Sequence, residues 1–419
     1  MERNIPRSAR GCHYNCCGTN ACLYPVGLER TRRLRSANSW ASRGGTKRYG
    51  DCSLRASTAL RDSRIDFFRG LSIYMIFVDH VTGDPFRKFT YHVFGFSDAA
   101  EIFVFLSGLA CGIAYSRLLV RQGFSALIWV LATRAARIYV YYALTSGVII
   151  LAVTGAIKHL TLEEPFGISA EHPLYAMLSA LCLISPPPIS GILVLYIILT
   201  LIVIPALLIA GDRHWLLALV VSGLTWVGAQ IFADFMAPLT HRWYLNPFAW
   251  QFLFTIGLIV GMKWDSEQPI LPLLSRHRWL MMAAWAVVVG AFLHRLLSSR
   301  GFDVTWLRLE PSTLSNMKEN LSPVRLVHFL SVALLLAVYF RRDSSLLKWS
   351  ISMPVIKTGM HSLEVFSLSV VLNYFVNIIV LTGSPSLGDR LLMDSIAFLL
   401  LALTAIALAY RRAFELKRA

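Results

Sequence analysis

Charged residues are scarce in this chain, and acidic ones are the scarcest. Only 15% of its 419 residues are Asp, Glu, Lys or Arg, whereas about 25% is usual in soluble domains. Hydrophobic residues make up 56%, and the mean hydropathy is +0.56. Apolar runs of about twenty residues, the length that crosses a bilayer, recur along most of the chain. The sequence therefore argues against a soluble core and predicts an all-α polytopic membrane helical bundle.

Several common signals are also missing. A secretory signal has an apolar segment after its basic residues, and the first 60 residues lack such a segment. The cysteines from Cys12 to Cys22 read C-x3-C-C-x4-C, which is not the paired CxxC spacing of a zinc site. No nucleic-acid-binding module accompanies the net charge of +16. We expect residues 1–60 to be a basic, Cys-containing disordered tail that binds no metal.

About ten apolar segments are predicted to cross the membrane. They cover residues 64–82, 97–117, 138–157, 190–210, 214–233, 247–263, 279–297, 324–340, 355–381 and 391–411. The shorter run 174–184 suits a re-entrant or interfacial helix. If the N-terminus is cytoplasmic, more Lys and Arg residues fall in cytoplasmic loops than in outer loops, as the positive-inside rule requires. This predicts a membrane domain over residues 61–412 and a short basic cytoplasmic tail over 413–419.

The first segment carries ionisable side chains on one face. At 100° per residue, Asp66, Arg69, Asp79 and His80 share less than half of the helix circumference. Arg69 is predicted near the inner boundary and His80 about 16 Å away in the outer half. Because ionisable groups at membrane depth are costly, they mark candidate functional sites. Arg69 could instead be a snorkelling anchor, and His80 could be a packing residue, but Asp79 beside His80 favours a general base.

Two acids, Asp98 and Glu101, begin the second segment at the depth of His80. They could orient His80 and stabilise its protonated form. They could instead cap the helix, with Glu101 as the partner of a capping box at Ser97-Asp98. Together with His80 and Asp79 they are the candidate catalytic residues.

The other polar positions near the predicted boundaries form two layers of candidate substrate-binding residues. The outer layer contains Asn246, Gln251, Arg325 and His328, and the inner layer contains Asp66, Arg69, His361 and Glu364. Trp243, Tyr244 and Trp250 are interpreted as interface aromatics. The small-residue spacings at Gly108 and Gly112, and at Gly257 and Gly261, predict close helix packing.

These same residues carry a resemblance to a known family. The motifs are R-x-D-x-x-R-G-L from Arg64, D-H at Asp79-His80, F-G-F-S-D-A-A-E-x-F-V-F-L-S-G from Phe94, N-P-F-A-W-Q-F from Asn246 and G-M-H-S-L-E-V-F from Gly359. They resemble the OpgC family, whose members are multi-span inner-membrane proteins that succinylate osmoregulated periplasmic glucans. The family is similar to the wider acyltransferase-3 superfamily, in which an Arg and a His are separated by ten residues on the first span, as Arg69 and His80 are. The proline of the family's L-P-L-Y segment is absent from Leu193–Tyr196.

The resemblance, over about residues 61–412, implies acyl transfer from a coenzyme A thioester, succinyl-CoA, to a sugar hydroxyl in the bacterial inner membrane. Arg69 would then contact phosphate or pantetheine oxygens of the donor. His80 would be the general base or carry the acyl group covalently. Arg325 would contact the succinyl carboxylate or the oxyanion.

No permanently bound cofactor is expected. The expected partners are the acyl-CoA donor, the glucan acceptor, the lipid bilayer and glucan biosynthesis proteins. Two other functions stay open. Membrane Asp, Glu and His residues also form proton relays, so a proton-coupled transporter is one alternative. The other is an acetyltransferase that acts on another exported glycan.

Overall fold

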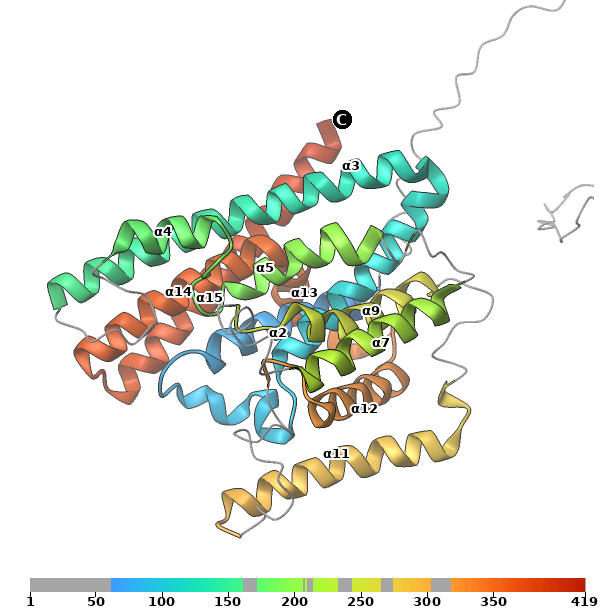
Figure 1. Cartoon of the computed structure of the whole chain (residues 1–419). Coiled ribbons are helices and arrows are strands. Elements are labelled where there is room, and N and C mark those ends of the chain that lie inside the picture. Colours follow the sequence, from blue (N-terminus) through green and yellow to red (C-terminus); the bar gives the residue numbers. More distant parts are fainter. Residues whose placement is uncertain are drawn as a thin grey trace, which may run out of the picture. The chain divides into compact units, whose positions relative to one another are not determined.

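The computed structural model describes residues 62–160, 172–205, 208, 214–232, 243–264, 274–302 and 318–418, and its regular elements there are all helical (Figure 1). The predicted N-terminal tail lies outside these residues. The first helices are α2 (Ser63–Asp79), the 3-10 turns η1 (Pro85–Phe89) and η2 (Tyr91–Phe94), α3 (Ala99–Leu160), α4 (Pro173–Leu181), α5 (Gly191–Ile198) with the π-helical turn η3 (Leu199–Val203), and α7 (Trp215–Ile231). They are followed by α9 (Pro247–Met262), α11 (Arg278–Ser299), α12 (Pro323–Tyr339), η7 (Ser345–Lys348), α13 (Ser352–Met360), α14 (Ser362–Gly383) and α15 (Leu387–Arg418).

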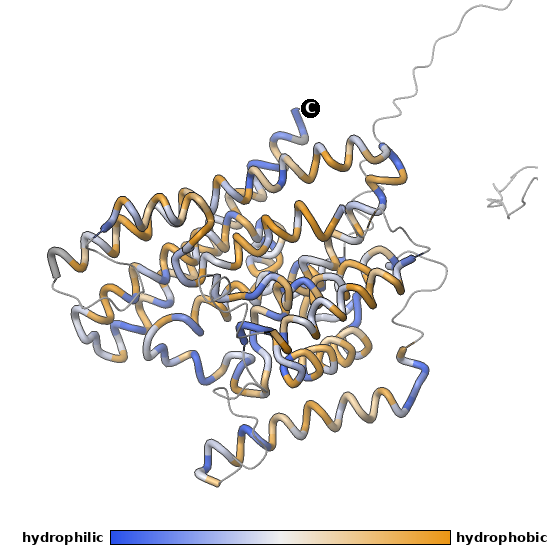
Figure 2. The backbone as a smooth tube through the Cα atoms, in the orientation of Figure 1, coloured by the Kyte–Doolittle hydropathy of each residue, from blue (hydrophilic) through white to orange (hydrophobic). Residues whose placement is uncertain are grey.

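Four of these helices, α3, α11, α14 and α15, are long and apolar enough to cross a membrane. Four shorter apolar stretches, over α5 with η3, α7, α9 and α12, have 10–17 residues each. Figure 2 shows apolar residues along the length of α11, whose side chains Met282, Trp285 and Phe292 are exposed in the protein alone. These features indicate a membrane protein, but the predicted number of about ten spans is not confirmed.

Two helices differ from the predicted segments. The predicted spans 97–117 and 138–157 both lie in α3, which continues for 62 residues across a kink at Gly123 with a φ of 81°. Gly123 itself, with a ψ of −178°, is not helical, so two helical segments of α3 meet there at a kink. The predicted span 355–381 is instead broken at His361, with φ −114° and ψ 40°, into α13 and α14. Helix α15 continues to Arg418, so most of the predicted C-terminal tail is helical.

Helices α3 and α9 approach each other at glycines, as the small-residue spacing predicted. A Cβ atom at Gly108 or Gly112 would overlap backbone carbonyls of α9, and one at Gly257 or Gly261 would overlap carbonyls of α3. Such close backbone contact is typical of small residues in membrane helices. It fixes the first half of α3 against α9.

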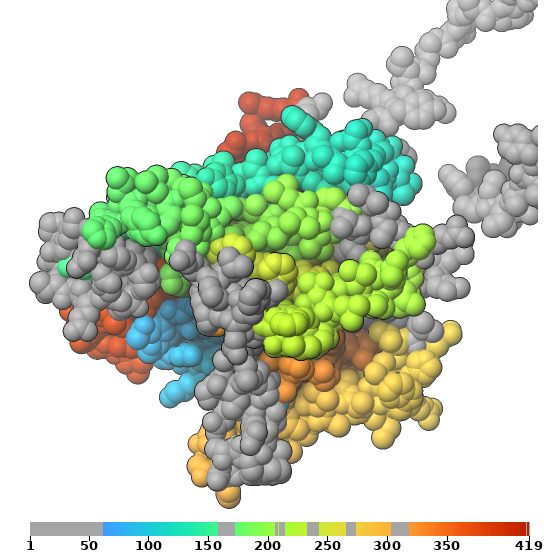
Figure 3. All heavy atoms as spheres, in the orientation of Figure 1, coloured from blue at the N-terminus to red at the C-terminus, as the bar shows by residue number. Residues whose placement is uncertain are grey.

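Helix α2 is held in a similar way against α13. A Cβ at Gly70 would overlap the carbonyl of Val355, and a Cβ at Gly359 would overlap the carbonyl of Asp66. The inner half of α2 therefore lies beside the break at His361. In the space-filling view, α4, α7 and α11 cover parts of the visible face (Figure 3).

Candidate functional site

Four charged side chains form a cluster where α3 and α12 begin. Asp98 accepts a hydrogen bond from the Ala100 amide at 2.8 Å, and Glu101 accepts one from the Asp98 amide at 2.9 Å. Arg325 donates to Glu101 through Nε at 2.7 Å and to Asp98 through Nη2 at 2.9 Å. The Nζ atom of Lys318 lies 2.9 Å from Asp98 Oδ2. The capping interpretation of Asp98 and Glu101 is confirmed, and both acids also hold Arg325.

His80 follows the last residue of α2, and the carbonyl of Ile76 orients its ring. Its Nδ1 atom lies 2.8 Å from that oxygen. A carbonyl can only accept a hydrogen bond, so Nδ1 carries the proton in this contact and Nε2 of the neutral ring is left as the basic atom. Asp98 and Glu101 accept the hydrogen bonds described above from backbone amides and from Arg325. The predicted contact of these acids with His80 is not among those bonds. Asp79 accepts a hydrogen bond from Thr90 at 2.5 Å and pairs with His92 at 3.0 Å.

Two asparagines of α14, which the sequence analysis missed, anchor the end of α2. Asn377 donates to the carbonyl of His80 and accepts from the amide of Thr82, both at 2.9 Å. Asn373 donates to the carbonyl of Phe77 at 2.9 Å. These bonds satisfy carbonyls that a helix C-terminus leaves without intrahelical partners. The signal was present in the sequence, because two amides four residues apart in an apolar helix face the same side.

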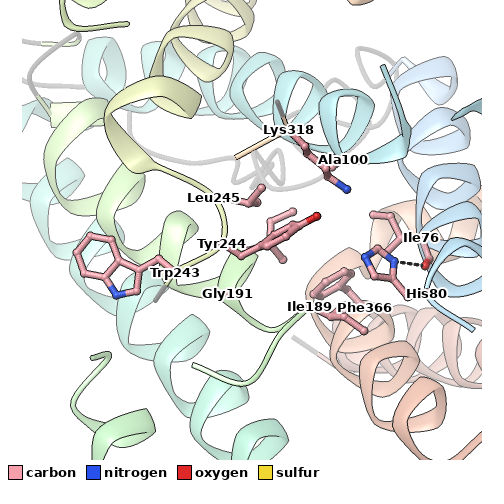
Figure 4. Close-up of a pocket in the computed structure, with 11 residues that line it drawn as sticks. Ile76, His80, Ala100, Ile189, Gly191, Trp243, Tyr244, Leu245, Lys318 and Phe366 are labelled. Atoms are coloured by element: carbon pink, nitrogen blue, oxygen red, sulfur yellow. Dashed lines mark hydrogen bonds between the residues drawn. The ribbon is translucent and has the colours of Figure 1, made fainter. Parts of the chain in front are cut away.

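A cavity of about 30 Å³ lies beside His80, with Lys318 and Tyr244 in its wall. That volume accommodates one or two water molecules or a single hydroxyl group. In Figure 4 the imidazole of His80, the hydroxyl of Tyr244 and the amine of Lys318 all point toward this space. The sequence analysis missed Lys318 and interpreted Tyr244 and Trp243 as interface aromatics, whereas the structure places both in the cavity wall.

Lys318 stays charged beside this cavity. Burial lowers the pKa of a lysine, but the Asp98 carboxylate, together with Tyr244 and Glu101, outweighs that effect and raises the pKa of Lys318 above its ordinary value. The ammonium also lies 5.8 Å from the centre of the Tyr244 ring, close enough for a cation–π contact.

The other predicted outer residues support this site or lie apart from it. Asn246 caps α9 by accepting from the Phe248 amide at 3.0 Å. The Nδ1 atom of His328 accepts a hydrogen bond from the Ser97 hydroxyl at 2.6 Å, and the His328 ring stacks on Tyr91 with ring centres 5.9 Å apart. Gln251 bonds to Ser222 of α7 at 2.6 Å, so it joins two helices rather than entering the cluster.

Arg69, Asp66 and His361 of the predicted inner layer lie where α2 packs against the break between α13 and α14. The Nη2 atom of Arg69 donates to the Ser362 hydroxyl at 2.5 Å. The Nε–H of Arg69 has no hydrogen-bond partner among the described residues. Asp66 is buried one turn earlier on α2, and His361 is buried next to Ser362. Glu364 is half-buried in the first turn of α14.

A second arginine, Arg134, joins this inner layer. It donates to the Tyr115 hydroxyl at 3.1 Å, and its Nε–H also lacks a partner in the described part of the chain. Arg69 and Arg134 lie within electrostatic range of each other, and Tyr196 and Cys111 are near both. Arg134 falls between the predicted spans 97–117 and 138–157. In the structure it lies in the part of α3 after the kink at Gly123 and contacts Tyr115 from the part before it.

Two stacked aromatic rings lie between the His80 cavity and Arg69. The centres of Phe103 and Phe366 are 5.5 Å apart. Phe366 lines the cavity, and the guanidinium of Arg69 lies 6.0 Å from the centre of the Phe103 ring. The site therefore has two parts, one with the imidazole of His80 and one with Arg69 and Arg134, and the Phe103–Phe366 pair lies between them.

Comparison with known proteins gives one match. A family model described as OpgC protein matches residues 61–413. No curated protein and no solved structure matches the chain.

Proposed function

Because this chain belongs to the OpgC protein family, we propose that it transfers a succinyl group from succinyl-CoA to hydroxyls of osmoregulated periplasmic glucans. Family membership supports a glucan-modifying acyltransferase in general. The succinyl donor, the inner-membrane location and the cytoplasmic position of both termini are our proposals. The observation that carries the proposed mechanism is the fixed imidazole of His80, whose basic nitrogen faces a cavity large enough for one hydroxyl.

His80 is the general base in this reaction. Its Nε2 atom takes the proton from a glucan hydroxyl while the hydroxyl oxygen attacks the thioester carbonyl carbon. The new C–O bond forms, the C–S bond breaks, and the departing thiolate of coenzyme A receives the proton from His80. The bond from Nδ1 to the Ile76 carbonyl holds the ring in the tautomer that this step needs.

The donor binds on the inner side, at Arg69 and Arg134. Each guanidinium keeps an Nε–H without a partner among the described residues, and a buried donor of this kind is costly unless a ligand satisfies it. Phosphate or carbonyl oxygens of an acyl-CoA are suitable acceptors. Arg69 and His80 are about 16 Å apart along α2, so an extended thioester arm must pass the Phe103–Phe366 pair to reach the base.

Mass spectrometry of periplasmic glucans tests this function. The strains carry a deletion of the gene, the wild type, or His80→Gln at equal membrane expression. We expect succinyl mass increments only with an active protein, and a transfer rate about 10²–10⁴-fold lower for His80→Gln because the general base is lost. His277→Gln is the matched control, since His277 is exposed at the start of α11.

Three results would contradict different parts of the proposal. Identical glucans from the deletion and wild-type strains would rule out the function. Full succinylation by His80→Gln would rule out the role of the base but leave the function intact. Acetyl increments in place of succinyl increments would identify a different donor.

A further inference from the structure

Lys318 lies on a well-anchored segment just before α12. The indole Nε1 of Trp250 donates to the Lys318 carbonyl at 3.1 Å. The Asn246 amide donates to the Glu319 carbonyl at 3.0 Å, and the Asn246 side chain donates to Asn320 Oδ1 at 2.8 Å. The start of α9 therefore fixes the backbone from which the lysine projects, and a preorganised position is what catalytic electrostatics requires.

The ammonium group of Lys318 has hydrogen-bonding capacity left for a reacting group. It carries three N–H donors, and the carboxylate of Asp98 at 2.9 Å accepts one. Figure 4 shows the amine projecting toward the space that the His80 ring faces. Arg325 differs, because two carboxylates already hold its guanidinium. The predicted substrate role of Arg325 stays a prediction, and Lys318 is the cation that lines the cavity beside His80.

The cavity that His80 and Lys318 share indicates which negatively charged group of the acyl donor the ammonium contacts. His80 and Lys318 line the same cavity, so the ammonium faces the groups on which the base acts. The free carboxylate of a succinyl group is several bonds away from its thioester carbonyl, so it lies farther from the reacting carbon than the carbonyl oxygen does. The charge that develops within reach of both residues is the one on the carbonyl oxygen.

We propose that Lys318 is a further catalytic residue, which stabilises the oxyanion formed when the glucan hydroxyl attacks the thioester. This inference rests on the proposed acyltransferase function. As the C–O bond forms, the carbonyl π electrons move onto the oxygen, and the ammonium of Lys318 donates a hydrogen bond to it. When the carbonyl re-forms, the C–S bond breaks and the proton on His80 passes to the thiolate. Lys318 itself keeps its protons throughout.

Steady-state kinetics of purified Lys318→Met and Lys318→Arg in detergent test the proposal, with succinyl-CoA and glucan as substrates. Removing an oxyanion donor costs about 10²–10³ in kcat, so we expect Lys318→Met to lower kcat by that factor with little change in KM. Lys318→Arg keeps the charge and should recover part of the rate. Lys88→Met is the matched control, because Lys88 is exposed in η1.

Folding is checked by thermal unfolding and by the stabilisation that succinyl-CoA produces. Both should be little changed in Lys318→Met, since Asp98 keeps its bond to Arg325 at 2.9 Å. An unchanged kcat, or a rise in KM alone, would overturn the oxyanion role. A loss that Lys318→Arg does not relieve, together with lowered thermal stability, would show a structural role instead. Absence of acyl transfer by the wild-type protein would refute the proposed function rather than the role of Lys318.

Discussion

Two groups of buried charges, near opposite ends of α2, differ in how far their hydrogen bonds are satisfied. In the outer group, Asp98, Glu101, Lys318 and Arg325 pair at 2.7–2.9 Å. In the inner group, Arg69 and Arg134 bond to hydroxyls of Ser362 and Tyr115, and their Nε–H groups lack partners among the described residues.

This difference separates a structural role from a binding role. Removing one member of a buried ion cluster leaves its partner as an uncompensated charge, which is strongly destabilising. A buried arginine with an unpaired N–H already lowers the stability of the ligand-free protein. A ligand with oxygen acceptors offsets that loss when it binds. Within the outer group, Arg325 and its two carboxylates therefore hold α3 and α12 together, whereas the inner pair is available to the donor.

The largest effect is expected from Arg325→Met. It leaves the fully buried Glu101 without its cationic partner, so the free energy of unfolding should fall by about 3–5 kcal/mol. Thermal unfolding in detergent and the yield of folded protein measure this loss. Arg300→Met, at an exposed position after α11, is the control. An unchanged unfolding temperature would show that the cluster does not hold the fold.

The inner pair should respond in the opposite way. Arg69→Met and Arg134→Met each remove hydrogen bonds to a charged ligand, worth about 1.5–3 kcal/mol. That predicts succinyl-CoA affinity about 10–150-fold weaker by calorimetry, with an unfolding temperature no lower than that of the wild type. Arg137→Met is the control, since Arg137 is exposed one turn later on α3. Destabilisation as large as that of Arg325→Met would remove the contrast between the two groups.

A smaller effect is expected where α13 supports the inner pair. A Cβ at Gly359 would overlap the Asp66 carbonyl, so Gly359→Ala must displace α13 from α2. Overpacking of this kind costs about 1–3 kcal/mol, and the displaced Ser362 should weaken donor binding as well. Gly155→Ala is the matched control, because nothing lies within 4 Å of its added Cβ. Equal unfolding temperatures for the two variants would argue against tight packing at Gly359.

The smallest effect concerns the ion pairs at the start of α2. Asp62 bonds to Arg64 at 2.7 Å and to Arg342 at 2.9 Å. Burial raises the pKa of Asp62, but the hydrogen bond and charge of Arg64 outweigh burial and lower it from 3.8. The stability from this lowered pKa is fully present above the unfolded value of 3.8 and is lost as pH falls through the folded pKa.

Asp62→Asn tests that pH dependence. Because the pair is partly exposed, we expect the variant to be about 0.2–1 kcal/mol less stable at pH 6. The difference from the wild type should shrink as the pH is lowered below 3.8. Chemical unfolding at several pH values measures it, and a difference independent of pH would contradict the assignment.

Much of the local structure could be predicted from the sequence. Apolar runs located α7, α9, α11 and α12 to within a few residues, because hydropathy depends on nearby residues alone. The capping residues Asp98 and Glu101 were recognisable for the same reason, since their spacing of three is a local pattern. The kink at Gly123 was not predicted, although glycine is the residue that most readily adopts its positive φ. The break at His361 was not predicted, because that position carries no proline or other strong stop signal.

The charged face of α2 was determined by the sequence itself, since helical periodicity sets which residues share a side. Which groups meet that face was decided by tertiary structure. Arg325 reaches Glu101 across 224 positions of the chain, and the fold brings Lys318 to His80 and Arg134 to Arg69. The physical reason is that a buried charge is satisfied by whichever partner helix packing brings within hydrogen-bond distance, and no local pattern records that choice.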